Sequence, residues 1–78
     1  MAASVRVPWV TVERYLADAF EQGAPLSRDD LIHHAIIRNA PALVIEVLEK
    51  LNEVQQYYSL EQVNRPLRHQ GYTTDYGR

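Results

Sequence analysis

Apolar residues recur along much of this chain with the spacing of amphipathic helices. The first such segment has apolar residues at i, i+3, i+4, i+7 and i+8, namely Val12, Tyr15, Leu16, Ala19 and Phe20. This spacing predicts a helix that begins at Thr11, whose hydroxyl suits an N-cap, and that ends through Gly23. Residues 1–10, which include Trp9, precede this helix, and we expect them to form an N-terminal arm.

The second predicted helix begins with a capping box. Ser27 is placed as the N-cap, and Asp30 follows three residues later, at the position from which a side chain reaches back to the cap. One face of this helix is apolar and consists of Leu31, Ile32, Ala35 and Ile36. Ile37 points away from that face, because successive residues are about 100° apart on a helix. Asn39 is predicted to end the helix in the left-handed conformation, which Asn tolerates better than most residues.

Pro41 divides the middle of the chain into two helices. Proline inside a helix costs about 3 kcal/mol, whereas in the first turn its missing N–H is not needed. The third helix is therefore predicted from about Pro41 to Leu51. Its buried face is expected to contain Val44, Val47, Leu48, Leu51 and Val54. Its outer face is expected to contain Glu46, Glu49, Lys50 and Glu53.

The fourth predicted helix starts at Ser59. Gln62 completes a capping box, and Tyr58 and Val63 form a hydrophobic staple across the helix start. Pro66 lies beyond the first turn, so we expect this helix to stop near Arg65. Residues 68–78 show no helical period and are predicted to be a flexible C-terminal tail. The predicted fold is all-α: a bundle of four short helices over residues 11–67, between a flexible arm (1–10) and the tail.

Length and composition limit the classes of function. The chain has 78 residues, no cysteine and a net charge of −2. It therefore forms one domain of marginal stability without disulfides or thiolate metal sites, which raises the expectation of self-association or docking onto a larger protein. The chain contains neither a signal-peptide core nor an apolar run of the roughly 18 residues that span a bilayer. We expect a soluble cytoplasmic protein with no membrane partner.

The titratable residues do not form a recognisable active site. His33 and His34 are adjacent and so point in different directions on a helix, which prevents them from chelating one metal; we expect one to face solvent and one to lie at the core boundary. Asp29 and Asp30 suit the positive end of the second helix. The sequence contains no phosphate-binding glycine loop and no nucleophile beside a base. We expect no enzyme activity, no cofactor, no metal and no small-molecule substrate.

Five sequence motifs, VERYL, PLSRDDLIHHA, NAP, VIEVLEKL and YYSLEQV, resemble those of a known family. The resemblance covers about residues 11–68 and is to the domain of unknown function 2795 family of small bacterial helical proteins. Asn39 and Pro41 stand where that family tends to have Gly and Asp, and Pro66 stands inside the family's last helix. The matching motifs are helix caps and core positions, so the resemblance implies the fold and transfers no catalytic residue.

A few large apolar residues fall off the predicted helix stripes. We hypothesise a partner surface that consists of Trp9, Ile37, Tyr72 and Tyr76, because Trp and Tyr are enriched at protein contacts. Packing of the arm back onto the bundle is an equally open alternative. The favoured function is a non-catalytic module for protein–protein interaction, by self-association or by docking onto a larger assembly. The alternative is a nucleic-acid-associated regulatory protein, against which the scattered arginines argue.

Overall fold

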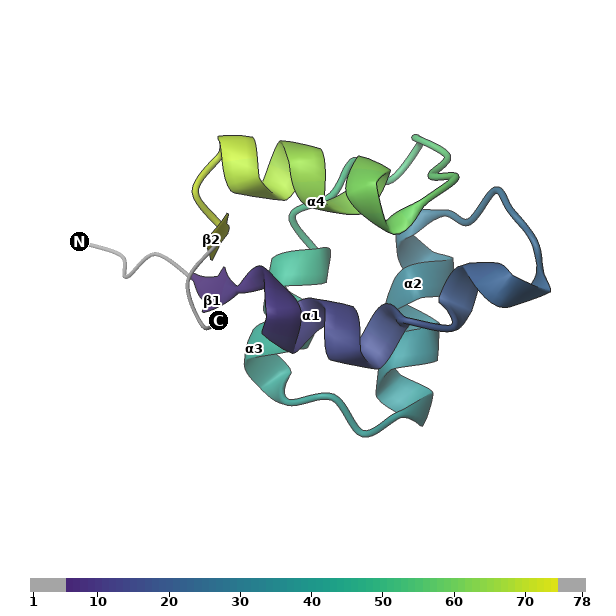
Figure 1. Ribbon diagram of the computed structural model, residues 1–78, viewed down its shortest axis with the longest axis horizontal. Coiled ribbons are helices and arrows are strands. Elements are labelled where there is room, and N and C mark those ends of the chain that lie inside the picture. The colour runs from purple at the N-terminus through teal and green to yellow at the C-terminus, as the bar shows by residue number, and fades with distance from the viewer. Residues whose placement is uncertain (1–5, 75–78) are drawn as a thin grey trace.

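The four predicted helices are present in the computed structural model, which describes residues 6–74 of the chain (Figure 1). The elements in chain order are β1 (Val7–Pro8), α1 (Trp9–Leu16), the 3-10 helix η1 (Ala19–Gln22), α2 (Arg28–Ile37), α3 (Ala42–Leu48), α4 (Leu60–His69) and β2 (Thr73–Thr74). None of the helices within residues 6–74 is long and apolar enough to cross a membrane.

The predicted start and end of α2 are confirmed. The hydroxyl of Ser27 accepts a hydrogen bond from the backbone N–H of Asp30 at 3.2 Å, and the Asp30 carboxylate accepts one from the N–H of Ser27 at 3.0 Å. Asn39 has φ = 61°, the left-handed conformation that ends the helix. Pro41 then precedes α3 as its N-cap, so this proline separates two helices as predicted.

Helix α4 is longer than the sequence predicts. Ser59 caps it as expected, but the helix passes through Pro66 and ends at His69, so the predicted stop near Arg65 is wrong. Leu67, one residue after the proline, is 1% exposed. Burying a leucine contributes about 1.5–3 kcal/mol, which is comparable to the cost of an internal proline. Gly71 (φ = 85°) then turns the chain back toward β1.

The hydrophobic core draws on every helix and on β1. Its buried residues are Val7, Val12, Leu16, Ala19, Leu31, Ala35, Val44, Val47, Leu48, Leu51, Tyr57, Val63 and Leu67. Two predicted core positions are wrong. Val54 is 80% exposed because α3 ends at Leu48, so its period does not extend that far. Ile36 is 55% exposed because it lies in the last turn of α2, where the chain leaves the core.

Tyr57, which the sequence analysis left out of the core, is 1% exposed, whereas the predicted staple residue Tyr58 is 58% exposed. The N–H and C=O of Tyr57 both bond to the backbone of Leu26, each at 2.8 Å. Its phenolic oxygen accepts a hydrogen bond from the N–H of Asn52 at 3.2 Å. Tyr57 therefore joins the segment before α2 to the loop after α3.

The fold is not purely α-helical, because the two ends of the described chain form a parallel pair of strands. Val7 pairs with Thr73 and Pro8 with Thr74. The side chain of Arg6 also donates to the carbonyl oxygen of Gly71 at 3.1 Å. Strands of two residues are too short to show a period of two in the sequence, which is why the pair was not predicted. Helix α1 begins at Trp9 and not at Thr11.

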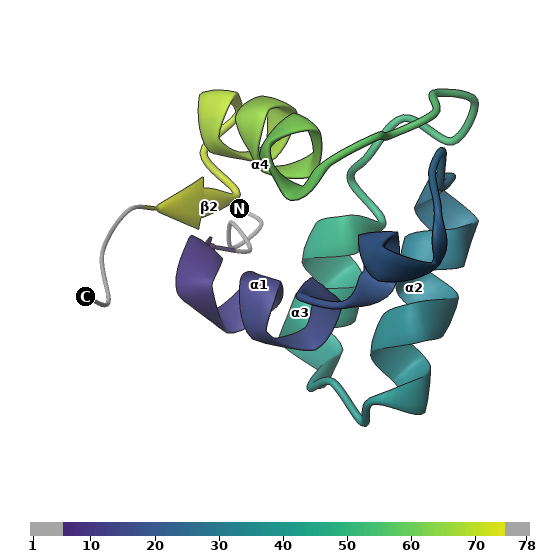
Figure 2. The same cartoon turned by 45° about the vertical axis from the view of Figure 1, so that its right-hand side comes forward.

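Helix α4 and the turn between α2 and α3 lie at opposite ends of the molecule (Figures 1 and 2). α2 and α3 pack on each other and are joined by residues 38–41, and α1 contacts both α2 and α4. Figures 1 and 2 place α4 at the top of the molecule and the turn between α2 and α3 at the bottom. A ligand on one of these regions is therefore remote from the other.

Candidate functional site

Trp9 and Tyr72, two of the four predicted partner residues, are half-buried and pack against the core. Because α1 begins at Trp9, this residue stands at i, i+3 and i+7 with Val12 and Leu16 on the apolar stripe. The ring of Tyr72 lies 5.7 Å from the Nζ atom of Lys50. Tyr76 lies outside the described residues.

Ile37, the remaining predicted partner residue, is 63% exposed. Ile36 and Leu43 are 55% and 51% exposed, and they lie on the last turn of α2 and the first turn of α3. We call Ile36, Ile37 and Leu43 the α2–α3 corner. The first turn of α1 lies beside β1, away from this corner in both views, so the structure does not bring Trp9 and Ile37 together (Figures 1 and 2).

Helix α2 carries apolar residues on its inner and outer faces. Leu31 and Ala35 are fully buried, whereas Ile36 and Ile37 face outward. An amphipathic helix normally confines its apolar residues to the face that packs on the core. The signal in the sequence was the run Ala35-Ile36-Ile37, which is too long for one face of a helix. Leu43 carried no such signal.

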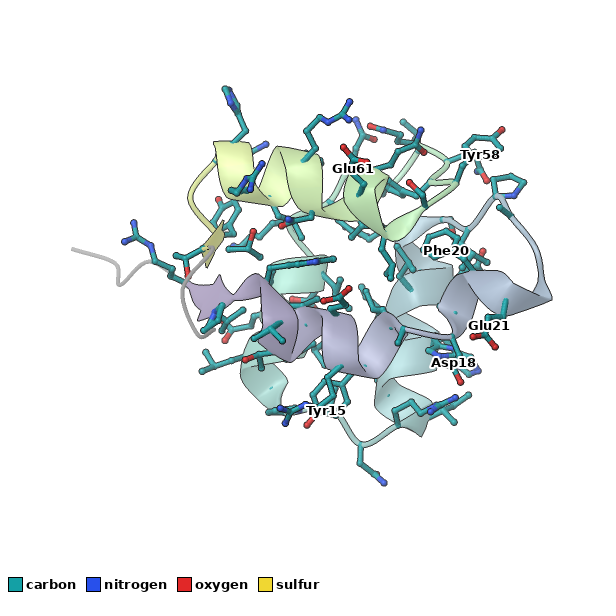
Figure 3. All side chains as sticks on the ribbon, in the orientation of Figure 1. Tyr15, Asp18, Phe20, Glu21, Tyr58 and Glu61 are labelled. Atoms are coloured by element: carbon teal, nitrogen blue, oxygen red, sulfur yellow. The ribbon has the colours of Figure 1, made fainter. Side chains whose placement is uncertain are left out.

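The last turns of α2 are held in place by a cluster of three charged or titratable side chains. His34 Nε2 lies 2.9 Å from Asp18 Oδ1, and the guanidinium of Arg38 pairs with the other carboxylate oxygen, Oδ2. His34 and Arg38 are four residues apart, so they share one face of α2. Asp18 follows α1 and projects toward α2 in Figure 3. One carboxylate thus fixes the end of α2 against the turn after α1.

This cluster has the carboxylate–histidine pair of a catalytic triad but lacks its nucleophile. Within residues 6–74, no serine, threonine or tyrosine hydroxyl donates to His34, and the Asp18 carboxylate is shared with Arg38. A triad needs a hydroxyl or thiol within hydrogen-bond distance of the histidine. His34 is half-buried and His33 exposed, which confirms the predicted division between core boundary and solvent.

The described part of the chain, residues 6–74, contains no group of three or more histidine, aspartate or glutamate residues placed to hold a metal ion. The acidic residues of α3 and the following loop lie at the surface: Glu46, Glu49 and Glu53 are exposed, as the sequence predicted. Arg28 at the start of α2 pairs with Glu53 at 3.3 Å and donates to the carbonyl oxygen of Glu49 at 3.4 Å. These contacts tie α2 to the end of α3.

Comparison with known proteins shows the family of this chain. A family model described as a protein of unknown function (DUF2795) matches residues 23–64, which is more than half of the chain. The chain belongs to this family, as the motifs of α2, α3 and α4 indicated. The matched segment contains the α2–α3 corner and ends within α4. No curated protein and no solved structure matches the chain.

Proposed function

We propose that this chain is a small non-catalytic helical module of the cytoplasm that mediates protein–protein interaction, either by self-association or by docking onto a larger assembly. The observation that carries the proposal is the α2–α3 corner, where three large aliphatic side chains are each more than half exposed. A chain this small has little apolar surface to spare, so side chains left outside the core mark a surface that a partner covers.

The free energy gained by burying the α2–α3 corner is that of a small contact, to which polar residues around the corner add further interactions. Complete burial of an Ile or Leu side chain contributes about 1.5–3 kcal/mol. Because about half of each side chain is already covered, burying the rest of the corner contributes roughly 2–4 kcal/mol. Arg38, Asn39 and Glu46 are exposed around the corner and suit the polar rim of an interface.

The charges near the α2–α3 corner favour protein over nucleic acid. Binding to phosphates requires several unpaired cations, and affinity rises with each phosphate that is neutralised. Arg38 at the end of α2 is engaged by Asp18, and the outer face of α3 carries exposed Glu46 and Glu49. Such a surface repels a phosphate backbone but suits the mixed rim of a protein contact.

The test compares Ile37→Lys with Val54→Lys, a substitution of an equally aliphatic and more exposed side chain in the loop before α4. Sedimentation velocity of the wild type over a wide concentration range measures self-association. We expect Ile37→Lys to abolish any concentration-dependent rise in mass and Val54→Lys to leave it unchanged, with identical circular dichroism in both.

Docking onto another protein is tested by placing a photo-crosslinking amino acid at position 37 or position 54 in living cells. We expect a discrete crosslinked product from position 37 and none from position 54. A strictly monomeric protein that gives the same crosslinks from both positions would refute the proposal.

A further inference from the structure

We infer that a groove along α4 binds an extended, acidic peptide segment of a partner protein. This site is distinct from the α2–α3 corner, because it lies on α4 and the loop before it, at the top of the molecule in Figure 1. The groove has a volume of about 550 Å³, within the range of roughly 300–1,000 Å³ that is usual for ligand sites. A stripe of side chains with helical spacing on α4 forms one wall, and the loop of residues 55–58 contributes the rest.

Side-chain amides come from half of the residues that line the groove. Four of the five glutamines of the chain line it: Gln55, Gln56, Gln62 and Gln70. Each glutamine offers both an N–H donor and a carbonyl acceptor, which is also what every peptide unit offers. The four amides are therefore complementary to the backbone of an extended peptide, whatever side chains the peptide carries.

A hydrogen bond between the loop of residues 55–58 and α4 orients the side-chain amide of Gln62. The backbone N–H of Tyr58 donates to Oε1 of Gln62 at 2.8 Å. Because the oxygen of Gln62 is occupied in this way, its NH₂ group remains as the end that donates to a ligand. The ring of Tyr58 is 58% exposed and projects outward at the start of α4 (Figure 3). It gives the groove one large apolar surface for contact with a ligand side chain.

The charges of the groove specify the sign of the ligand. The chain has ten acidic residues and eight lysines and arginines, yet none of the described residues that line the groove is acidic. One of the arginines, Arg65, lines the groove, and so does His69. Arg65 pairs with Glu61 at 3.0 Å, but both side chains are about three-quarters exposed. An exposed pair of this kind contributes little to stability, so a carboxylate of the ligand can replace Glu61 at little cost.

Pro66 lines the groove from within α4. Proline has no N–H, so it does not donate to the carbonyl of Gln62 as the corresponding residue of an uninterrupted helix would.

A peptide fits these features better than a nucleic acid. A single-stranded nucleic-acid site combines aromatic platforms with a continuous track of cations. The groove offers one exposed tyrosine and one arginine, which are too few platforms and too few cations for such a site. Four amides, one arginine and one histidine suit a peptide backbone with an occasional carboxylate.

The experiment uses the full chain labelled with ¹⁵N, because NMR resolves the side-chain NH₂ signals of the glutamines. Three capped octapeptides are titrated: one alternates serine with glutamate, one serine with glutamine and one serine with lysine. We expect the glutamate peptide to shift the signals of Gln55, Gln62 and Gln70 in a saturable manner. Its affinity is expected to exceed that of the lysine peptide by about tenfold or more.

Two matched variants locate the site. Arg65→Gln should weaken binding of the glutamate peptide about tenfold, whereas Arg14→Gln, an exposed arginine on α1, should change it less than about twofold. Tyr58→Ala should weaken all three peptides while circular dichroism stays unchanged.

Four results would overturn the inference: equal affinity for the three peptides, no saturable shift with any of them, equal effects of Arg65→Gln and Arg14→Gln, or tighter binding of oligothymidine at the same glutamines. None of these results bears on the α2–α3 corner, so the two proposals fail separately.

Discussion

Tyr57 offers the sharpest test of how this fold is held together, because its neighbour Tyr58 is a control of the same residue type. Tyr57 is 1% exposed and Tyr58 is 58% exposed. The perturbation is the removal of a single oxygen atom by Tyr57→Phe. This oxygen accepts the hydrogen bond from the N–H of Asn52 at 3.2 Å, which closes the loop between α3 and α4.

The magnitude follows from the loss of one hydrogen bond without loss of packing. A hydrogen bond within a protein contributes about 0.5–1.5 kcal/mol net, so Tyr57→Phe should lower the free energy of unfolding by about 1 kcal/mol. For a domain of this size that corresponds to a fall of about 4–8 °C in Tm. Tyr57→Ala also empties the space of the ring and should cost about 3–5 kcal/mol, a large part of the stability of a small domain.

The assay is urea unfolding, followed by circular dichroism and by the fluorescence of Trp9, the single tryptophan of the chain. Because Trp9 packs against the core, its emission reports tertiary packing while circular dichroism reports helix content. Tyr58→Phe and Tyr58→Ala should each change stability by less than about 0.5 kcal/mol. The reasoning is refuted if Tyr57→Phe and Tyr58→Phe have the same midpoint, or if Tyr58→Ala is as damaging as Tyr57→Ala.

Three further predictions concern stability and are checked by urea unfolding, with circular dichroism as the only signal for Trp9→Ala, which removes the single tryptophan. Ser27→Ala and Ser59→Ala should each cost about 0.5–2 kcal/mol, since each removes the hydroxyl that caps a helix; unchanged midpoints would contradict the caps. Leu48→Ala should cost about 2–5 kcal/mol, because Leu48 is fully buried, whereas the half-exposed Leu43 should tolerate alanine with a markedly smaller loss. Trp9→Ala should lower stability, because Trp9 packs against the core; an unaffected Tm would restore it as a contact residue.

The parts of the fold that could be predicted from the sequence depend on signals only a few residues apart. The capping box of Ser27 and Asp30 spans four residues, and the left-handed turn at Asn39 depends on that one residue. Pro41 was interpreted correctly because a proline after such a turn suits the start of a helix. The same reasoning failed at Pro66, where burial of Leu67 outweighs the local preference.

The parts that could not be predicted depend on contacts between distant segments. The pairing of Val7 with Thr73 joins residues near the two ends of the chain, and two-residue strands leave no pattern in the sequence. The cluster of Asp18, His34 and Arg38 forms only because α1 packs on α2. The sequence did show that His34 and Arg38 share a helix face, but it did not show what faces them.

The α2–α3 corner was predicted only in part, because helical spacing gives the direction of a side chain but not the extent of the core. Ile37 was identified because it falls off the apolar stripe of α2. Ile36 was assigned to the buried face, since helical spacing alone does not show how far along a helix the core extends. Trp9 was taken as a contact residue because the start of α1 was placed two residues too late, which removed it from a stripe to which it belongs.

The family match and the core together indicate which parts of the chain serve the α2–α3 corner. The match covers residues 23–64 and so leaves out α1, both strands and the second half of α4. Yet Val12 and Leu16 of α1 are fully buried, and Asp18 after α1 holds both His34 and Arg38 beside the corner. The segment outside the match therefore completes the core and fixes the end of α2, so the orientation of Ile36 and Ile37 depends on residues well beyond the matched segment.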